Sequence, residues 1–528
     1  MDSLHEPGDR ARYYAQGLWR DETFYDLLCR QADAQPEAFA LRDSRRRLNW
    51  RNLHAWVNGI AADLTDRGLG AGDRASIWLG NRAEVLATFL ACNRQSIACN
   101  PSLHRTHTGE EVVALLERLG ARLLLTESGH GEGDAFIAGS LRPDGLDTVL
   151  TPETLAGPGA PPETPRADPD ATCYLAFTSG SSGPPKCVAH SANTILANTR
   201  DMVRDWGHGP DTRMLTLSPL SHHIAWVAMG QWLNCGCELI VNDPPKGTSQ
   251  FDWLLETGAT YVMGVPTHAM DILAELQRRG KDRLGEVKIF YMAGAPIPAA
   301  VAEAFSAQGI VPQNVYGMTE NSSHQYTHPD DNFTTITSTC GRGGQAYEVR
   351  IFDAEDADKE VPVGEHGQIA GRGAALMLGY LGDAKANRNR DGWFLSGDLG
   401  VLDDRSNLRI VGRLKDLIIR GGRNIAPAHI EDLAVRHAAV EKAAAFPIAD
   451  ARLGEKVCLA ILGQSEPTPL LDHLAEQGLS RYDMPEYFLQ MEAFPLTPSG
   501  KILKRELVAM VVRGELAPQP VRWSPSDA

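Results

Sequence analysis

Apolar and polar positions along the first third of the chain follow two periods that alternate in a regular order. Apolar residues recur every three or four positions in one set of segments, which predicts amphipathic helices. These helical segments are 24–34, 48–64, 83–92 and 110–119. Short apolar runs between them predict buried strands at 74–79, 97–100 and 122–126. Because strands and helices alternate, the fold is predicted to be α/β, built from layered sheets.

The pattern changes further along the chain. Residues 129–170 are rich in Gly, Pro and acidic side chains, which predicts a loop that crosses between subdomains. Buried strands are predicted again at 260–265, 287–292 and 367–373. The last part predicts a small α+β domain: a strand, a Gly-Gly turn and a restart over 418–425, strands at 443–448 and 457–462, and helices at 430–438 and 469–477. Pro427 is expected at the start of the first of these helices.

One loop combines small hydroxyl residues, two glycines and a lysine. It runs from Thr178 to Lys186 and follows the apolar run 173–177. Glycine lets the backbone approach a ligand closely, and unpaired N–H groups in such a loop bind anions. The spacing differs from the Walker A pattern, which has four residues between its glycines and a Ser or Thr after its lysine. The loop therefore predicts phosphate binding, with a flexible Gly/Ser linker as the alternative.

Composition excludes several classes of protein. A chain of 528 residues is too long for one compact core, so two or more domains are expected. The net charge of −16 argues against a nucleic-acid binder and against a polybasic membrane anchor. The nine cysteines are scattered and odd in number, which is typical of reduced thiols in a cytoplasmic protein. The N-terminus shows no signal-peptide pattern, and no run of 18 apolar residues predicts a membrane span.

Four stretches together resemble the adenylate-forming enzymes, which comprise acyl-CoA synthetases, luciferases and the adenylation domains of peptide synthetases. They are the loop 178–186, the segment 316–320, the pair 396–400 and 412–416, and the segment 498–501. The resemblance covers nearly the whole chain in the family's order. It implies that ATP, Mg²⁺ and coenzyme A take part in the reaction, and that a large N-terminal part with a β-rich subdomain is followed by a small mobile C-terminal domain.

The resemblance also implies a nucleotide site. Tyr316 offers a ring for stacking on a purine, Thr319 a hydroxyl for phosphate, and Glu320, together with Thr178, oxygen atoms for Mg²⁺. Asp398 is the expected partner of the ribose hydroxyls and Arg413 a further ribose or phosphate contact, although the two could simply form an ion pair. The remaining nucleotide-binding positions are Ser179, Gly180, Ser181, Ser182, Gly183, Lys186, Gly294, Ala295, Pro296, Asn314, Gly317, Met318 and Lys501. Catalysis is assigned to Lys501, Lys186, Thr178 and His222.

The domain boundaries follow from the same resemblance. Residues 1–412 form the N-terminal domain, 413–416 the hinge with Lys415, and 417–514 the C-terminal lid, and the tail 515–528 is expected to be disordered. A lysine at an exposed turn is usually only solvated, but in this family the residue matched by Lys501 reaches the substrate carboxylate and the α-phosphate. Gly421, Gly422 and Arg423 are expected to shape the coenzyme A channel.

The acyl pocket determines which acid is used. Its expected residues are His222, His223, Ala225, Trp226, Gly264 and Met318. Adjacent histidines point in different directions, so a joint metal site is not expected at His222 and His223. Residues 216–229 contain no Asp or Glu to pair with an ammonium group, which disfavours an amino acid. Leu217 replaces the asparagine of hydroxybenzoate enzymes, and the runs 317–330 and 339–344 are most similar to those of cyclohexanecarboxylate-type CoA ligases.

The predicted function is therefore an ATP-dependent ligase that joins a compact apolar acid to coenzyme A. An alicyclic acid, benzoate and a short or medium-chain fatty acid all remain open. A free-standing adenylation enzyme that loads a carrier protein is the main alternative. A nucleotide sensor on the same scaffold and luciferase-like oxygenation are the more distant ones.

Overall fold

The computed structural model describes residues 3–178, 185–382, 388–496 and 502–524. The chain forms two compact units. The first contains residues 1–349, 371–388 and 405–408, and the second contains 350–370, 389–404 and 409–528. This division differs from a single boundary at residue 412. The reason is that segments 350–370 and 389–404 belong to a sheet whose last strand leads directly into the C-terminal part.

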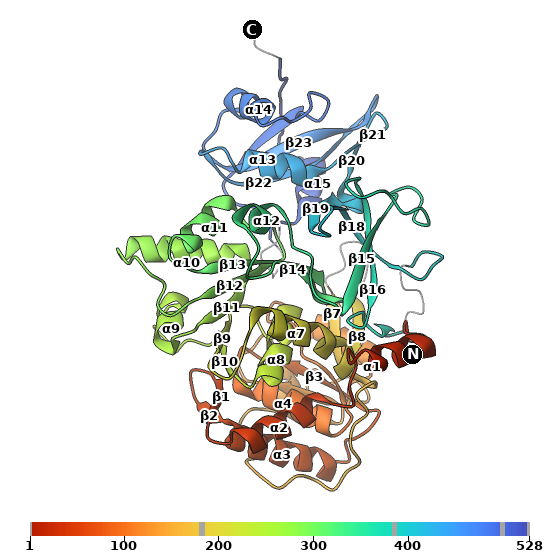
Figure 1. Ribbon diagram of the computed structural model, residues 1–528, viewed down its shortest axis with the longest axis vertical. Coiled ribbons are helices and arrows are strands. Elements are labelled where there is room, and N and C mark those ends of the chain that lie inside the picture. The colour runs from red at the N-terminus through yellow and green to blue at the C-terminus, as the bar shows by residue number, and fades with distance from the viewer. Residues whose placement is uncertain (1–2, 179–184, 383–387, 497–501, 525–528) are drawn as a thin grey trace. The chain divides into compact units, whose positions relative to one another are not determined.

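The first unit is built on two large sheets with helices between and around them, so the α/β prediction is confirmed (Figure 1). The eight-stranded sheet has the order β14 (Ser322–Tyr326), β13 (Val311–Met318), β12 (Ile289–Ala293), β11 (Tyr261–Gly264), β9 (Arg213–Thr216), β10 (Glu238–Val241), β1 (Phe39–Arg42), β2 (Arg47–Asn49). The seven-stranded sheet has the order β17 (Gly379–Tyr380), β8 (Lys186–Ser191), β7 (Thr172–Thr178), β4 (Ala98–Asn100), β3 (Arg74–Trp78), β5 (Leu123–Thr126), β6 (Thr148–Leu150). Their central strands are parallel and buried, which explains their nearly continuous apolar sequences.

The helices of this unit cover the sheets. They are α1 (Pro7–Ala15), α2 (Phe24–Ala34), α3 (Trp50–Asp66), α4 (Ala83–Arg94), α5 (Gly109–Leu119), α6 (Gly133–Ile137), α7 (Ala192–Trp206), α8 (His223–Cys235), α9 (Gln250–Thr257), α10 (Pro266–Arg278), α11 (Ala299–Ser306) and α12 (Phe333–Ser338). The helix predicted at 24–34 is confirmed residue for residue, because Thr23 and Asp26 form a capping box that fixes its start.

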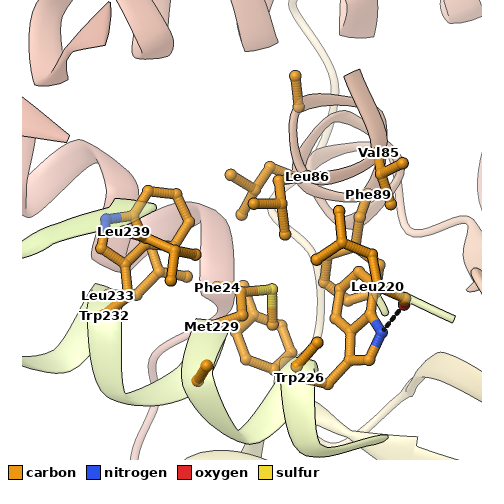
Figure 2. Packing of buried hydrophobic residues seen from close by; sticks show 14 of the residues in the cluster. Phe24, Val85, Leu86, Phe89, Leu220, Trp226, Met229, Trp232, Leu233 and Leu239 are labelled. Atoms are coloured by element: carbon orange, nitrogen blue, oxygen red, sulfur yellow. Dashed lines mark hydrogen bonds between the residues drawn. The ribbon is translucent and has the colours of Figure 1, made fainter. Parts of the chain in front are cut away.

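One hydrophobic cluster joins both sheets to α2, α3, α4, α7 and α8. Figure 2 shows its centre, where Trp226 and Met229 of α8 lie near Phe24 of α2 and Phe89 of α4. The rings of Phe89 and Trp226 have centroids 4.4 Å apart. Because α8 is buried along almost its whole length, the residues at its N-terminus are held firmly in place.

The second unit holds the remaining elements, apart from strand residues 347–349, 371–373 and 408, which belong to the first unit. A four-stranded sheet has the order β15 (Tyr347–Phe352), β16 (Gly367–Gly373), β18 (Phe394–Leu402), β19 (Leu408–Arg413), and the short helix η1 (Leu414–Asp416) follows. The C-terminal sheet contains β20 (Ile418–Arg420), β21 (Arg423–Ile425), β22 (Val440–Asp450), β23 (Gly454–Gly463), β24 (Tyr487–Met491) and β25 (Gln519–Pro520). Helices α13 (Pro427–Ala434), α14 (Pro467–Glu476) and α15 (Lys504–Val512) accompany it. The predicted α+β character is confirmed.

Two expectations need correction. The segment 129–170 contains the short helix α6 and the strand β6, which pairs with β5, so it is not only a loop. The tail was expected to be disordered from residue 515, but β25 pairs with β24 there. Val521 and Trp523 pack against the core of the C-terminal sheet, and an edge strand tolerates the proline that made this segment resemble a disordered tail.

Two further expectations can be compared with the structure. No helix in the described ranges is long and apolar enough to cross a membrane. All nine cysteines are free thiols.

Candidate active site

The two ends of the predicted phosphate loop, Thr178 and Lys186, lie on antiparallel strands that pair with each other. Strands β7 and β8 form this hairpin, and Thr178 is the direct partner of Lys186 across it. The Thr178 hydroxyl donates to the Lys186 carbonyl at 3.4 Å, and Lys186 is exposed. The residues between them that were predicted to bind phosphate lie outside the described part of the chain: Ser179, Gly180, Ser181, Ser182 and Gly183. Both ends of the loop are therefore fixed by the sheet.

The segment that carries Thr319 and Glu320 is the tip of a second hairpin. Met318 of β13 pairs with Ser322 of β14, which leaves residues 319–321 as the turn. The turn is tight, because a Cβ added to Gly317 would lie 1.7 Å from the Ser322 carbonyl oxygen. The Asn321 side chain accepts a hydrogen bond from the Met318 N–H at 3.0 Å and closes the turn. Gly317 is therefore required by the backbone, apart from any role in nucleotide binding.

A buried histidine that sequence analysis did not predict holds this turn against β8. His190 Nε2 lies 2.6 Å from the Thr319 carbonyl oxygen, so this nitrogen carries the proton and donates. Its Nδ1 then accepts from the Thr194 hydroxyl at 2.9 Å. Burial lowers the pKa of His190 to about 4, which keeps the ring neutral. The apolar run after Lys186 gave no sign that one of its members would contact a segment so distant in sequence.

Tyr380 was also not predicted, although it contacts two predicted site residues. Its hydroxyl donates to Glu320 Oε1 at 2.9 Å, and the Lys186 Nζ lies 4.5 Å from the centroid of its ring. The Glu320 carbonyl accepts from the Met377 N–H at 2.7 Å. A two-residue strand has no hydrophobic period, so only the tertiary structure reveals this residue.

The predicted adenine contacts lie at the carboxyl ends of neighbouring strands. Ala293 of β12 pairs with Val315 of β13, so Gly294 and Tyr316 follow at the same edge of the sheet. Gly294 has φ +91° and begins an exposed segment with Ala295 and Pro296. Ligands of α/β sheets commonly bind at such an edge.

Two predicted nucleotide contacts differ in their surroundings. The Asn314 amide is buried and donates to the Ile336 carbonyl at 2.9 Å, so it anchors α12. Tyr316 is half-buried, and its ring meets the His324 ring edge-on at 5.4 Å between centroids. His324 also packs against Tyr347 at 4.3 Å. Burial lowers the pKa of His324 to about 3, so Tyr316 rests on a neutral ring.

His222 and His223 lie at the N-terminus of α8 and face different neighbours. His222 is the N-cap residue, and its ring lies 4.7 Å from that of His104. His223 stacks on His190 at 5.5 Å, and its Nε2 lies 3.0 Å from the Ser322 hydroxyl. Burial, together with the neighbouring His190, holds the pKa of His223 well below its usual value. His223 thus connects α8 with the hairpin that carries Glu320.

The other predicted pocket residues differ in their burial and in their neighbours. Trp226 is fully buried in the core, and its indole N–H donates to the Leu220 carbonyl at 2.8 Å (Figure 2). Ala225 is buried beside it, and Met318 at the end of β13 is half-buried. Gly264 ends β11, where an added Cβ would lie 2.9 Å from His268 Nδ1. Within the described ranges, no group of three or more His, Cys, Asp or Glu side chains could hold a metal ion.

The second unit contains the predicted ribose contact and hinge. Arg413 Nε lies 3.1 Å from Asp398 Oδ1, so the two residues form an ion pair. Asp398 is buried, and its N–H donates to the Ser396 hydroxyl at 3.0 Å. Lys415 lies in η1, and burial and the neighbouring Arg413 lower its pKa.

The remaining predicted positions belong to the hairpin of β20 and β21. Gly421 and Gly422 form its turn with φ +58° and +84°, values that favour glycine. Arg423 pairs with Asp483 at 2.5 Å. Lys501 lies outside the described residues.

Comparison with known proteins adds a second source of information. The profile of a family described as AMP-binding enzyme matches residues 28–381. The chain is 30% identical to pseudomonine synthase PmsE of Pseudomonas entomophila, over 96% of this chain and 86% of the relative. It is also 30% identical to feruloyl-CoA synthase of an Amycolatopsis species, over 90% of this chain and 97% of the relative. ATP-bound MatB from Rhodopseudomonas palustris has the same fold, with a TM-score of 0.81, 24% identity and coverage of 93% and 99%.

Proposed function

The chain belongs to the family of AMP-binding enzymes and is an AMP-forming acid–thiol ligase of the adenylate-forming superfamily; we propose here which acid it activates and which role each site residue has. The proposed substrate is a compact apolar carboxylic acid, either alicyclic, aromatic or a short to medium-chain aliphatic acid. Coenzyme A is the proposed thiol acceptor, and the cytoplasm is the proposed location.

One observation supports the site more than any other. Lys186 from one hairpin and Glu320 from another meet at Tyr380, which contacts both. A cation and a carboxylate at fixed places suit a triphosphate that arrives with a divalent metal. If the loop 178–186 were only a solvated linker and Glu320 only a surface carboxylate, no residue would need to contact both Lys186 and Glu320.

In the first half-reaction, the substrate carboxylate attacks the α-phosphorus of ATP, and pyrophosphate leaves. Thr178, the serines of the loop and Lys186 are proposed to hold the β- and γ-phosphates. Tyr316 would stack on the adenine, and Asp398 with Arg413 would bind the ribose hydroxyls. Lys501 would stabilise the charge on the transferring α-phosphoryl group. This chemistry depends on positioning and charge rather than on proton transfer.

Glu320 is suited to act as a ligand of the Mg²⁺ that such a reaction uses. Tyr380 occupies one carboxylate oxygen, and no cluster of three metal-binding side chains lies in the described ranges. A metal at Glu320 would therefore take most of its ligands from phosphate and water, which is the usual coordination of Mg²⁺. Bound there, Mg²⁺ would neutralise charge on the phosphates.

In the second half-reaction, a thiol attacks the acyl adenylate and AMP leaves. The C-terminal domain is proposed to move about Lys415, so that Lys501 is replaced by the turn with Gly421, Gly422 and Arg423. A carrier protein with a pantetheine thiol is the alternative acceptor, since it would use the same first half-reaction.

The acyl pocket proposed here is formed around His222, His223, Ala225, Trp226, Gly264 and Met318. The absence of Asp and Glu from 216–229 supports an acid without an ammonium group. Trp226 is a member of the hydrophobic core and is proposed to flank this pocket through packing.

A panel of acids tests the proposal. The protein is incubated with ATP, Mg²⁺ and coenzyme A together with cyclohexanecarboxylate, benzoate, hydroxybenzoates, fatty acids or amino acids, and mass spectrometry follows AMP and acyl-CoA. A thioester with an alicyclic, aromatic or aliphatic acid is expected. Pyrophosphate release without any coenzyme A thioester would instead support a carrier-protein acceptor. No pyrophosphate with any acid would contradict the proposal and favour a nucleotide sensor.

A further inference from the structure

Tyr380 lies beside Lys186 because of the register of two strands. Tyr380 of β17 is the partner of Val188 on β8. Side chains two positions apart on a strand share one face of the sheet, so Lys186 and Tyr380 are diagonal neighbours on that face. The distance of 4.5 Å from the Lys186 Nζ to the ring centroid is within the range of a cation–π contact.

The segment that contains this short strand also holds Glu320. The Met377 N–H donates to the Glu320 carbonyl at 2.7 Å, and the Tyr380 hydroxyl donates to the Glu320 carboxylate at 2.9 Å. Segment 377–380 therefore fixes Glu320 through its main chain and its side chain. Glu320 is 9% exposed, so its carboxylate is largely shielded from water and its orientation depends on such contacts.

We propose that Tyr380 is a positioning residue that sets Lys186 and Glu320 relative to each other for the binding of ATP with its metal. The hydroxyl donates to one oxygen of Glu320 and so fixes the orientation in which this carboxylate would hold the metal. The ring holds the ammonium group of Lys186 in place for the phosphates. This inference rests on the proposed function, because it assumes that Lys186 and Glu320 serve the triphosphate and Mg²⁺.

The two contacts of Tyr380 can be separated by substitution. Tyr380→Phe keeps the ring under Lys186 and removes the donor to Glu320. Tyr380→Leu removes both. Tyr291→Phe is a matched control, because Tyr291 is also buried in the first unit and shares a 2.7 Å hydrogen bond with the Ser323 hydroxyl.

Calorimetric titration of ATP, with Mg²⁺ or with EDTA, measures the two effects without catalysis. Tyr380→Phe is expected to bind metal-free ATP as the wild type does and to lose roughly tenfold of the affinity gained from Mg²⁺, as expected for a lost hydrogen bond to a charged group. Tyr380→Leu should also bind metal-free ATP more weakly. Tyr291→Phe should retain both affinities. In Glu320→Gln, adding Tyr380→Phe should cause no further loss.

Other results would overturn the inference. If Tyr380→Phe keeps the full gain from Mg²⁺, or Tyr380→Leu lowers only the melting temperature, Tyr380 is a packing residue. A wild-type protein whose ATP affinity does not respond to Mg²⁺ also contradicts it. By contrast, if the wild-type protein binds ATP with Mg²⁺ but forms no acyl adenylate, the proposed function is contradicted. The ATP affinities of the Tyr380 variants would still test the positioning role of Tyr380.

Discussion

The imidazole of His190 donates a 2.6 Å hydrogen bond to the carbonyl of Thr319. His190 lies on β8, the strand that begins at Lys186, and Thr319 lies beside Glu320 at the tip of the second hairpin. This single bond joins the two segments in which nucleotide binding was predicted. His190 is buried and Thr319 is half-buried, so the loss of this donor is expected to cost free energy.

Replacing His190 should therefore misplace the Thr319–Glu320 turn. His190→Met leaves the carbonyl unpaired, which costs about 1–3 kcal/mol, and we expect roughly a tenfold lower kcat for acid-dependent ATP–pyrophosphate exchange. His190→Gln can place an amide N–H near the position of Nε2 and should recover most of that loss, with the KM for the acid unchanged in both variants. If Gln is as harmful as Met, the donated hydrogen bond is not the reason for the effect.

Asp398 can be tested for ribose binding with a modified nucleotide. Asp398→Ala should raise the KM for ATP about 10-fold to 100-fold, as for the loss of hydrogen bonds to a carboxylate. It should also abolish the preference for ATP over 2′-deoxy-ATP, because the hydroxyl that distinguishes them would have lost its acceptor. If Asp398 serves only its ion pair with Arg413, the variant will be less stable but will keep that preference.

Lys501 should separate the two half-reactions. Lys501→Ala is expected to block formation of the acyl adenylate while thioester formation from supplied acyl adenylate continues, since the proposed role of the lysine ends with adenylation. Stopped reactions analysed by mass spectrometry measure both steps. Lys359→Ala is the control, because this exposed lysine pairs only loosely, at 3.5 Å, with Asp353. Equal loss in both half-reactions would contradict the assignment.

His324 should make the protein less stable in acid. Its pKa is lowered to about 3 in the folded state by burial, whereas an unfolded histidine titrates near 6.5. Between these values the unfolded state binds the additional proton, so stability present above pH 6.5 is lost as the pH falls toward 3. At pH 5 this amounts to about 2 kcal/mol.

His324→Phe keeps a ring against Tyr316 and Tyr347 but cannot be protonated. Urea unfolding at pH 7.5 and pH 5 should show that the variant gains about 2 kcal/mol relative to the wild type on going to the lower pH. His5 and His190, whose pKa values are also lowered to about 4, should leave a residual pH dependence in both proteins. An unchanged difference between variant and wild type at the two pH values would contradict the argument.

The sequence by itself determined many of the elements and the candidate chemistry. Helix 24–34 could be predicted because its apolar period and its capping residues are local. The hydroxyls, glycines and lysine of 178–186 and the segment 316–320 also indicated phosphate chemistry, because each carries its functional groups within a few residues. Such signals require no knowledge of the fold.

The tertiary structure decided which distant residues serve these segments. His190 looked like one member of an apolar strand, and Tyr380 belongs to a strand of two residues. Strand register places Tyr380 on the same face of the sheet as Lys186. Because Tyr380 and Glu320 are both buried, the hydrogen bond between them is shielded from water. Trp226, which is expected to line or flank the acyl pocket, packs against Phe89 and Tyr174, two residues that are distant from it in sequence. These relationships depend on long-range pairing, which local periodicity does not encode.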